Sequence, residues 1–314
     1  MRGAGSWSRP MRVRFWRPAD IRHVRIGAKS RWQCYGLIVD ATFGEYSSAV
    51  KDIRGKTVLL TGASTGLGPH IARRLHQAGA RFVLSARNED ALQKLAKELG
   101  ESRVVVADLS RAGEPERLAR EAGEVDVLVS NAGVPVSRRL ARLSIEEIDG
   151  AIAVNLRAGI ILAYALAPAM VKRAEGHMVF MSSIAGKIPA AGVSVYNATK
   201  FGIRGFALAM REELWGTGVG VSVVSPTFVS DAGMWAETGL KADPMAGEVT
   251  PAQVATAVWN AIVKNRAEID VMPIQLRASL KIMAIAPGLF RAVARSTGGT
   301  RPNDELGERQ KHKR

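Results

Sequence analysis

The chain has 314 residues, of which 47% are apolar, and this proportion excludes a wholly disordered protein. A single cysteine, Cys34, excludes an internal disulfide framework and a multi-cysteine metal site. The formal net charge of +15 lies at the ends, because residues 1–39 carry +8, residues 264–314 carry +6 and residues 40–263 carry only +1. We therefore expect a nearly neutral folded domain between two basic appendages.

The appendages and the domain are expected to divide the chain into three parts. Residues 1–50 form a basic, poorly ordered extension, and its many arginines beside one acid, Asp20, within the first 39 residues are also typical of a mitochondrial transit peptide. Residues 51–275 form a catalytic domain, and residues 276–314 form an apolar and basic helix with a polar tail. No apolar run reaches the roughly 18 residues of a spanning helix. The nearest, Ala158–Val171, is interpreted as a buried or interface helix, so we expect a cytoplasmic protein.

Seven apolar runs predict the strands of a parallel sheet, since runs rich in Val, Leu and Ile are typical of strands covered on both faces. Segments with helical period separate them, which predicts an α/β fold with one doubly wound sheet of the Rossmann type. The predicted strands are Thr57–Thr61, Arg81–Ser85, Arg103–Val106, Val125–Val129, Met178–Met181, Val219–Val224 and Ile269–Met272. The predicted helices are Pro69–Gln77, Glu89–Leu99, Pro115–Ala122, Ile145–Val171, Tyr196–Trp215 and Pro251–Lys264.

The first predicted strand runs into a glycine-rich turn, T-G-A-S-T-G-L-G at residues 61–68, and a helix opens at Pro69. Glycines let the backbone approach a pyrophosphate, and a helix N-terminus supplies free N–H groups and a positive dipole end. The turn therefore predicts a dinucleotide phosphate site. Its predicted members are Gly62, Ser64, Thr65, Gly66, Leu67 and Gly68.

The spacing G-x-x-x-G-x-G after Thr61 resembles the phosphate loop of the short-chain dehydrogenase/reductase family, and the resemblance extends over about residues 52–275. Asp108 follows the third strand in an A-D-L motif, and S-N-A-G at residues 130–133 resembles the family's N-N-A-G after the fourth. The resemblance implies that Asp108 contacts the adenine. It also implies cofactor contacts at Leu109, Asn131, Ala132 and Gly133.

The resemblance also covers the catalytic residues. Tyr196 and Lys200 match the family's Y-x-x-x-K signature, Ser183 lies thirteen residues before the tyrosine, and Asn155 matches the helix asparagine that orders a proton-relay water. These four are the implied catalytic residues, and Tyr196 and Lys200 are implied to contact the cofactor too. The separation of four residues puts Tyr196 and Lys200 on one helix face, where an ammonium lowers the phenol pKa of about 10. Ser182 competes with Ser183, and the spacing selects Ser183.

The end of the second predicted strand indicates which cofactor is used. Ala86 stands where NAD enzymes place an acid for the ribose hydroxyl, and Arg87 follows, whose guanidinium can pair with a 2′-phosphate. Glu89 and Asp90 fit the first turn of the next helix, with Asn88 as its cap. NADP(H) is therefore the favoured cofactor, with NAD(H) as the alternative.

The segment after the sixth predicted strand departs from the family's P-G-x-x-x-T pattern, because Pro226 is followed by Thr227 rather than by glycine. The resemblance still implies cofactor contacts at Pro226 and Val229. Apolar residues then alternate with glycine and charged residues: Phe228, Met234, Trp235, Leu240 and Met245. They are interpreted either as a flexible lid for an apolar substrate or as residues that pack this segment onto the body.

The motifs together predict an NADP(H)-dependent oxidoreductase that interconverts a carbonyl and a secondary alcohol on a 3-oxoacyl, steroid-like or other lipid substrate. The alternative is a catalytically silent nucleotide sensor or scaffold with the same fold. The resemblance implies a homodimer or homotetramer through the helices at 145–171 and 196–215. In residues 274–295, basic residues flank an apolar stretch. This segment is interpreted either as a peripheral membrane contact or as a helix that packs on the core or in an oligomer. No metal site or nucleic-acid partner is predicted, because no readable motif accompanies the basic tails.

Overall fold

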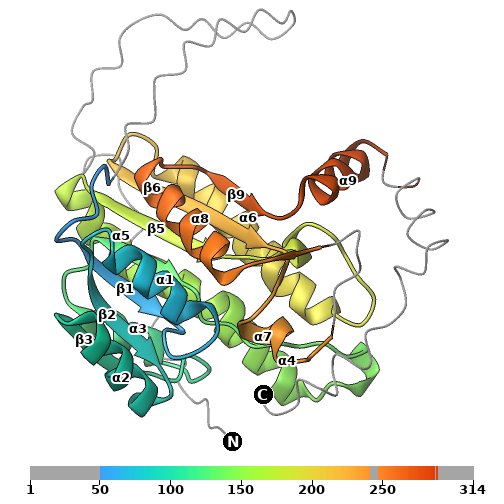
Figure 1. Cartoon of the computed structure of the whole chain (residues 1–314), viewed down its shortest axis with the longest axis horizontal. Coiled ribbons are helices and arrows are strands. Elements are labelled where there is room, and N and C mark those ends of the chain that lie inside the picture. The colour runs from blue at the N-terminus through green and yellow to red at the C-terminus, as the bar shows by residue number, and fades with distance from the viewer. Residues whose placement is uncertain (1–49, 241–246, 287, 289–314) are drawn as a thin grey trace, which may run out of the picture. The chain divides into compact units, whose positions relative to one another are not determined.

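Seven parallel strands form one sheet in the computed structural model, which describes residues 50–240, 247–286 and 288 (Figure 1). The strand order is β3-β2-β1-β4-β5-β6-β9. The chain adds β2 and β3 on one side of β1, and then crosses over to add β4 and the later strands on its other side. This is the doubly wound Rossmann arrangement, so the predicted fold class is confirmed. The strands are β1 (Thr57–Thr61), β2 (Arg81–Ala86), β3 (Ser102–Val106), β4 (Val127–Ser130), β5 (Gly176–Met181), β6 (Val219–Pro226) and β9 (Glu268–Val271).

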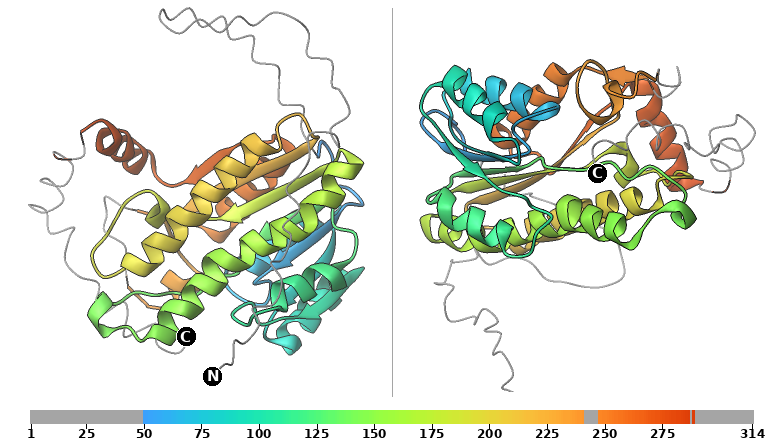
Figure 2. Two further views of the ribbon diagram at one scale, coloured as in Figure 1. Left: turned by 180° about the vertical axis from the view of Figure 1, so that it is seen from behind. Right: turned by 90° about the horizontal axis from the view of Figure 1, so that it is seen from below.

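Helices cover both faces of the sheet (Figure 2). One face carries α1 (Leu67–His76), α2 (Glu89–Leu99) and α8 (Pro251–Val263), and the other carries α3 (Glu114–Ala122), α5 (Ala158–Arg173) and α6 (Ser194–Glu213). Asn88 caps α2 by accepting a hydrogen bond from the N–H of Ala91, as predicted. The remaining helices are α4 (Ile145–Ile152), α7 (Gly233–Ala236) and α9 (Ile274–Ile285).

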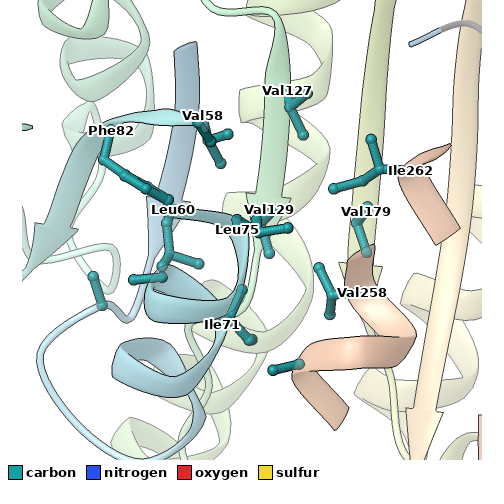
Figure 3. Close-up of a cluster of buried hydrophobic side chains, with 14 of the residues drawn as sticks. Val58, Leu60, Ile71, Leu75, Phe82, Val127, Val129, Val179, Val258 and Ile262 are labelled. Atoms are coloured by element: carbon teal, nitrogen blue, oxygen red, sulfur yellow. The ribbon is translucent and has the colours of Figure 1, made fainter. Parts of the chain in front are cut away.

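The alternation of side chains along each strand builds two separate cores. Val58 and Leu60 of β1 pack with α1 and α8 on one face (Figure 3). Leu59 between them packs on the other face. All three are fully buried. Because successive side chains of a strand point to opposite faces, both faces need apolar residues, which explains the continuous apolar runs in the sequence.

The long helix predicted at 145–171 is interrupted. α4 leads into a π-helical turn at Ala153–Arg157, and α5 continues to Arg173. The segment Ile145–Arg173 is long and apolar enough to cross a membrane by length and composition alone. Its residues Leu162 and Met170 nevertheless pack on the sheet and are fully buried, so α5 is a core helix with one exposed face.

A second, two-stranded parallel sheet joins β7 (Phe228–Val229) to β8 (Glu248–Val249), and the sequence patterns did not predict it. We call residues 230–240, which follow β7 and include α7, the lid segment. α9 begins at Ile274, two residues before the predicted C-terminal part, directly after Pro273. The N-terminal extension before residue 50, Met245 and the chain beyond residue 288 lie outside the described residues.

Candidate active site

The glycine-rich turn forms a cradle at the end of β1. Gly62 has φ +64, and a Cβ on it would lie 2.8 Å from Cα of Ala132. A Cβ on Gly68 would overlap the backbone of Gly62 and Ala63, so α1 starts directly against the turn. Gly66 is the N-cap of α1 without any side-chain cap, and the first turn holds no acidic residue. The cradle therefore fits the pyrophosphate of a dinucleotide, whose charge the helix N-terminus stabilises.

Thr61 and Asn131 tie the end of β1 to the end of β4. The hydroxyl of Thr61 accepts hydrogen bonds of 3.1 Å from the N–H groups of Asn131 and Ala132. The side-chain amide of Asn131 donates to the carbonyls of Thr61 and Gly62, each at 3.1 Å. These bonds bring the phosphate loop and the S-N-A-G segment together at the reversal point of the sheet, where doubly wound folds bind their ligands.

The predicted adenine end lies at the neighbouring strands β2 and β3. Arg87 is exposed after β2, and within residues 50–240 and 247–286 no hydrogen bond or ion pair holds its guanidinium. Leu109 is 7% exposed. Burial raises the pKa of Asp108, but hydrogen bonds from Ser110 and the charge of Arg87 outweigh it and hold that pKa below its usual range. The Asp108 carboxylate is thus anionic and lies within electrostatic range of Arg87.

Ser183, Tyr196 and Lys200 meet where β5 ends. Ser183 caps a short 3-10 turn, Ile184–Gly186, after β5, and Tyr196 and Lys200 lie in the first two turns of α6. The Nζ of Lys200 donates to the carbonyl of Met181 at 2.9 Å and lies 5.6 Å from the ring centroid of Tyr196. Tyr196 also forms a side-chain hydrogen bond with Ser183.

Burial changes the pKa of both α6 groups. It raises the pKa of the Tyr196 phenol to about 12, an effect that the hydrogen bond to Ser183 partly offsets. It lowers the pKa of the Lys200 ammonium to about 8, because a charge is costly where the side chain is only 4% exposed. Burial therefore favours the neutral form of both groups. Each group needs stabilising neighbours to become or remain charged.

Asn155 lies in the π turn and points toward the same place. Its Oδ1 accepts from the N–H of Val134 at 2.7 Å, and its Nδ2 donates to the carbonyl of Val134 at 3.0 Å and to Thr199 Oγ1 at 3.4 Å. A Cβ on Gly133 would lie 3.4 Å from Asn155 Oδ1 and 3.8 Å from Lys200 Nζ. Gly133 therefore marks the point on which these two predicted residues converge.

The structure separates the two adjacent serines. Ser182 is 4% exposed, and its hydroxyl donates to the main-chain carbonyl of Lys200 at 2.9 Å. Ser183 is partly exposed, and its Oγ accepts from the N–H of Ala185 at 3.2 Å. Ser182 is thus engaged in packing the strand end onto α6, and Ser183 is the serine that faces Tyr196.

Pro226 and Val229, which were predicted to contact the cofactor, are both buried. Pro226 ends β6, and the N–H of Thr227 donates to the carbonyl of Val271 at 3.0 Å. Val229 is 7% exposed and packs in the core beside its β8 partner Val249. The main chain of Val229 pairs with β8 and its side chain supports the second sheet.

Two residues near the site were not predicted as functional. Asn197 is buried beside Tyr196, and Met234 of the lid segment brings its Cε within 3.4 Å of the Cβ position on Gly133. A signal for Asn197 was present in the sequence, since asparagine is a poor helix former and is unusual on a buried helix position. The contact of Met234 depends on the fold of the lid segment and has no such signal.

Comparisons with known proteins agree with this geometry. The family model for short chain dehydrogenases matches residues 56–243. The ketoacyl reductase HetN of Nostoc sp. is 38% identical over 244 residues, which are 75% of this chain and 85% of that protein. The solved closed form of serine dehydrogenase complexed with NADP+ is 30% identical, with a TM-score of 0.62, and the match covers 69% of this chain and 95% of that one. A metagenomic short-chain oxidoreductase in complex with NADP is 34% identical, with a TM-score of 0.60 and coverage of 70% and 97%.

The family model spans more than half of the chain, and its motifs occupy one edge of a doubly wound sheet in the family's order. The chain belongs to the short-chain dehydrogenase family of oxidoreductases.

Proposed function

We propose that this oxidoreductase interconverts a carbonyl group and a secondary alcohol on an apolar substrate, with NADP(H) as its cofactor. The observation that carries the proposal is the convergence of Asn155 and Lys200 on Gly133, with the hydrogen-bonded pair of Ser183 and Tyr196 beside it. This cluster lies at the strand ends next to the phosphate cradle, where a dinucleotide and a substrate can meet.

Tyr196 is the proton donor in reduction and the acceptor in oxidation, and Ser183 holds the carbonyl oxygen by a hydrogen bond. When bound, the nicotinamide supplies the hydride for the carbonyl carbon and, in its oxidised form, a positive charge. Because burial raises the pKa of Tyr196 to about 12 even with the hydrogen bond to Ser183, nearby positive charge is needed to bring the phenol into range for proton transfer. Lys200 supplies that charge, and it has two donors left besides the one bonded to Met181.

Asn155 contributes through its main chain in this proposal. Its side-chain amide is already engaged with Val134 and Thr199. A π turn shifts the backbone hydrogen bonds of a helix by one residue and is frequently found at functional sites. The main-chain carbonyl in this turn is therefore the group that we assign to holding a proton-relay water.

Arg87 supports the assignment of NADP(H). Its guanidinium is exposed at the end of β2 without a partner among the described residues, so it is available to a 2′-phosphate. Two solved relatives whose structures contain NADP, serine dehydrogenase and the metagenomic oxidoreductase, support the same choice.

The lid segment supports an apolar substrate. Met234 lies against Gly133, where Asn155 and Lys200 also converge. The ring of Trp235 packs against that of Phe228 at a tilt of 45°, with ring centroids 4.2 Å apart. The similarity to a ketoacyl reductase favours a 3-oxoacyl compound within this apolar class.

The test is a panel of ketones and secondary alcohols assayed with NADPH and NADP+. Tyr196→Phe removes one hydroxyl, so we expect kcat to fall by roughly 10²–10⁴-fold while NADPH binding persists. Tyr164→Phe is the matched control, because Tyr164 is 79% exposed on α5, and it should act like wild type. Full turnover in Tyr196→Phe would refute the proposed chemistry. NADPH binding without turnover of any compound by wild type would favour the silent sensor or scaffold.

We further propose that two copies of the chain associate through α5 and α6. Tyr164 and Phe201 are 79% and 40% exposed on these helices, and apolar side chains gathered on a surface mark interaction sites. Light scattering after size exclusion should give a dimer or tetramer for wild type and a smaller species for Tyr164→Asp. A monomeric wild type would contradict this association.

A further inference from the structure

The two hydroxyls of the proposed reaction come from different elements. Ser183 follows β5, Tyr196 lies in α6, and the loop at residues 184–193 connects them. Their separation is therefore set by how this loop is held against α6. A reacting hydroxyl misplaced by about 1 Å can cost roughly a hundredfold in rate.

Asn197, the residue after Tyr196, holds this loop with every donor of its side-chain amide. Its Nδ2 donates to the carbonyls of Ala185 at 2.5 Å and Ile188 at 2.9 Å. Its Oδ1 accepts from the N–H of Ala190 at 3.1 Å. One side chain on α6 thus bridges three points of the loop.

The location of Asn197 argues against a role in the helix itself. Asparagine is unfavourable in helix interiors, and a buried amide is costly unless it is hydrogen-bonded. Asn197 is only 7% exposed, and the side-chain hydrogen bonds that the structure gives it all go to the loop rather than to α6. What this residue stabilises is the junction between the loop and the turn of α6 that carries Tyr196.

Other contacts hold the ends and the outer side of the same loop. Ser182 bonds the Lys200 carbonyl, and a Cβ on Gly186 would lie 2.7 Å from that same carbonyl oxygen. On the outer side, Lys187 pairs with Glu268 at 3.0 Å and with Asp270 at 2.5 Å in β9. Ser182 and Gly186 thus hold the start of the loop against Lys200 of α6, and Lys187 holds it against β9. Asn197 instead holds three points of the loop against the turn of α6 that carries Tyr196.

We propose that Asn197 is a positioning residue, which sets the placement of Ser183 relative to Tyr196 by fixing the loop between them. The expected effect of Asn197 on the reaction rate rests on the proposed function. Its expected effect on the loop rests on the hydrogen bonds alone. Removing the amide should therefore lower kcat much more than it changes KM, and should expose the Ala190 amide to exchange.

The experiment compares Asn197→Ala and Asn197→Asp with Asn265→Ala as the matched control. Asn265 is also 7% exposed and hydrogen-bonds Arg211, but it lies near Gly220 at the opposite end of β6. Asn197→Asp keeps the volume and the acceptor for Ala190 while losing both donors at neutral pH. Turnover of a ketone with NADPH, hydrogen exchange of residues 184–193 and thermal stability are measured for each protein.

We expect both Asn197 variants to lose about tenfold to a hundredfold in kcat with KM changed less than about threefold. Exchange of the loop should accelerate in Asn197→Ala, while Asn265→Ala should lose stability without either effect. Unchanged kcat and unchanged loop exchange in a folded Asn197→Ala would overturn the inference, as would an equal loss of kcat in Asn265→Ala. If wild type turns over no ketone, the proposed function fails, and the exchange measurement alone decides whether Asn197 holds the loop.

Discussion

The ammonium of Lys200 donates a hydrogen bond to the main-chain carbonyl of Met181 at 2.9 Å, in a position where the lysine is only 4% exposed. The folded protein therefore carries a buried cation whose pKa burial lowers to about 8. At pH 7 the lysine is charged in both the folded and the unfolded chain, so the folded state bears the cost of desolvating it.

Lys200→Met should for this reason raise the free energy of unfolding at pH 7, by about 1–3 kcal/mol after the lost hydrogen bond is subtracted. The gain should shrink as the pH rises from 8 to 10.5, because folded wild-type Lys200 is neutral above its pKa of about 8 and its desolvation cost disappears. Urea unfolding without cofactor at pH 7 and pH 9 measures this, and turnover by the variant should be lost. A variant less stable than wild type at pH 7 would contradict the expectation.

Arg87→Ala should weaken NADPH binding by roughly tenfold to a hundredfold, since hydrogen bonds to charged groups contribute about 1.5–3 kcal/mol. NADH lacks the 2′-phosphate, so its affinity should change little, and Ala86→Asp should shift the preference toward NADH. Titration of both cofactors at fixed ionic strength measures these effects. Arg111→Ala is the control, because Arg111 is an exposed cation 3.5 Å from Asp108 at the same edge. Equal loss of both cofactors in Arg87→Ala would count against NADP(H).

Gly62→Ala should abolish tight cofactor binding and destabilise the fold. A methyl group there meets Cα of Ala132 at 2.8 Å, and φ of +64 is strained for alanine. Gly100→Ala separates these causes, since Gly100 has φ +74 but nothing within 4 Å of its Cβ position. The control should lose about 1 kcal/mol of stability and bind NADPH normally. Urea unfolding and NADPH titration check both variants, and normal binding by Gly62→Ala would show that the cradle tolerates a methyl group.

His177 should make the protein sensitive to mild acid. Burial, with a further contribution from the charge of Arg211, lowers its pKa to about 3, and its Nε2 lies 2.8 Å from Ser222 Oγ. The folded state keeps this ring neutral while the unfolded chain binds a proton below about pH 6.5, so the free energy of unfolding falls as pH falls from 6.5 toward 3. Wild type should lose about 1.5 kcal/mol more than His177→Gln between pH 6.5 and 5. Urea unfolding at both pH values tests this, and parallel losses in the two proteins would contradict it.

The sequence predicted the sheet well because its central strands, such as β5 and β6, are buried on both faces and therefore leave continuous apolar runs. The β2, β5 and β6 strands extend one or two residues beyond their predicted ends, as at Ala86 and Pro226, since pairing with a neighbour decides where a strand stops. The π turn at Ala153–Arg157 was missed, because one inserted residue scarcely changes the spacing of apolar side chains along an otherwise regular helix. The strands β7 and β8 are two residues each, too short for any periodicity.

The candidate site was predictable to the extent that motifs mark it. Tyr196 and Lys200 are close in sequence and share a helix face, and the phosphate turn follows a strand and opens a helix, so local rules sufficed. The choice between Ser182 and Ser183 rested on spacing, and its physical basis, the bond from Ser182 to the Lys200 carbonyl, is a tertiary contact. The contacts of Asn197 with the loop and of Met234 with Gly133 are also tertiary. The pattern of residues within one helix or strand cannot predict such contacts.

The ribbon formed by β7 and β8 has a consequence for the lid segment between them. Phe228 and Val229 pair with Glu248 and Val249, so the two ends of the intervening chain are held side by side by the main chain. The entropy of bringing those ends together is lost once, when the ribbon forms, and does not depend on what the lid segment contacts. We therefore expect that exchanging lid-segment residues such as Met234 changes which substrates the enzyme accepts without changing the β7–β8 pairing.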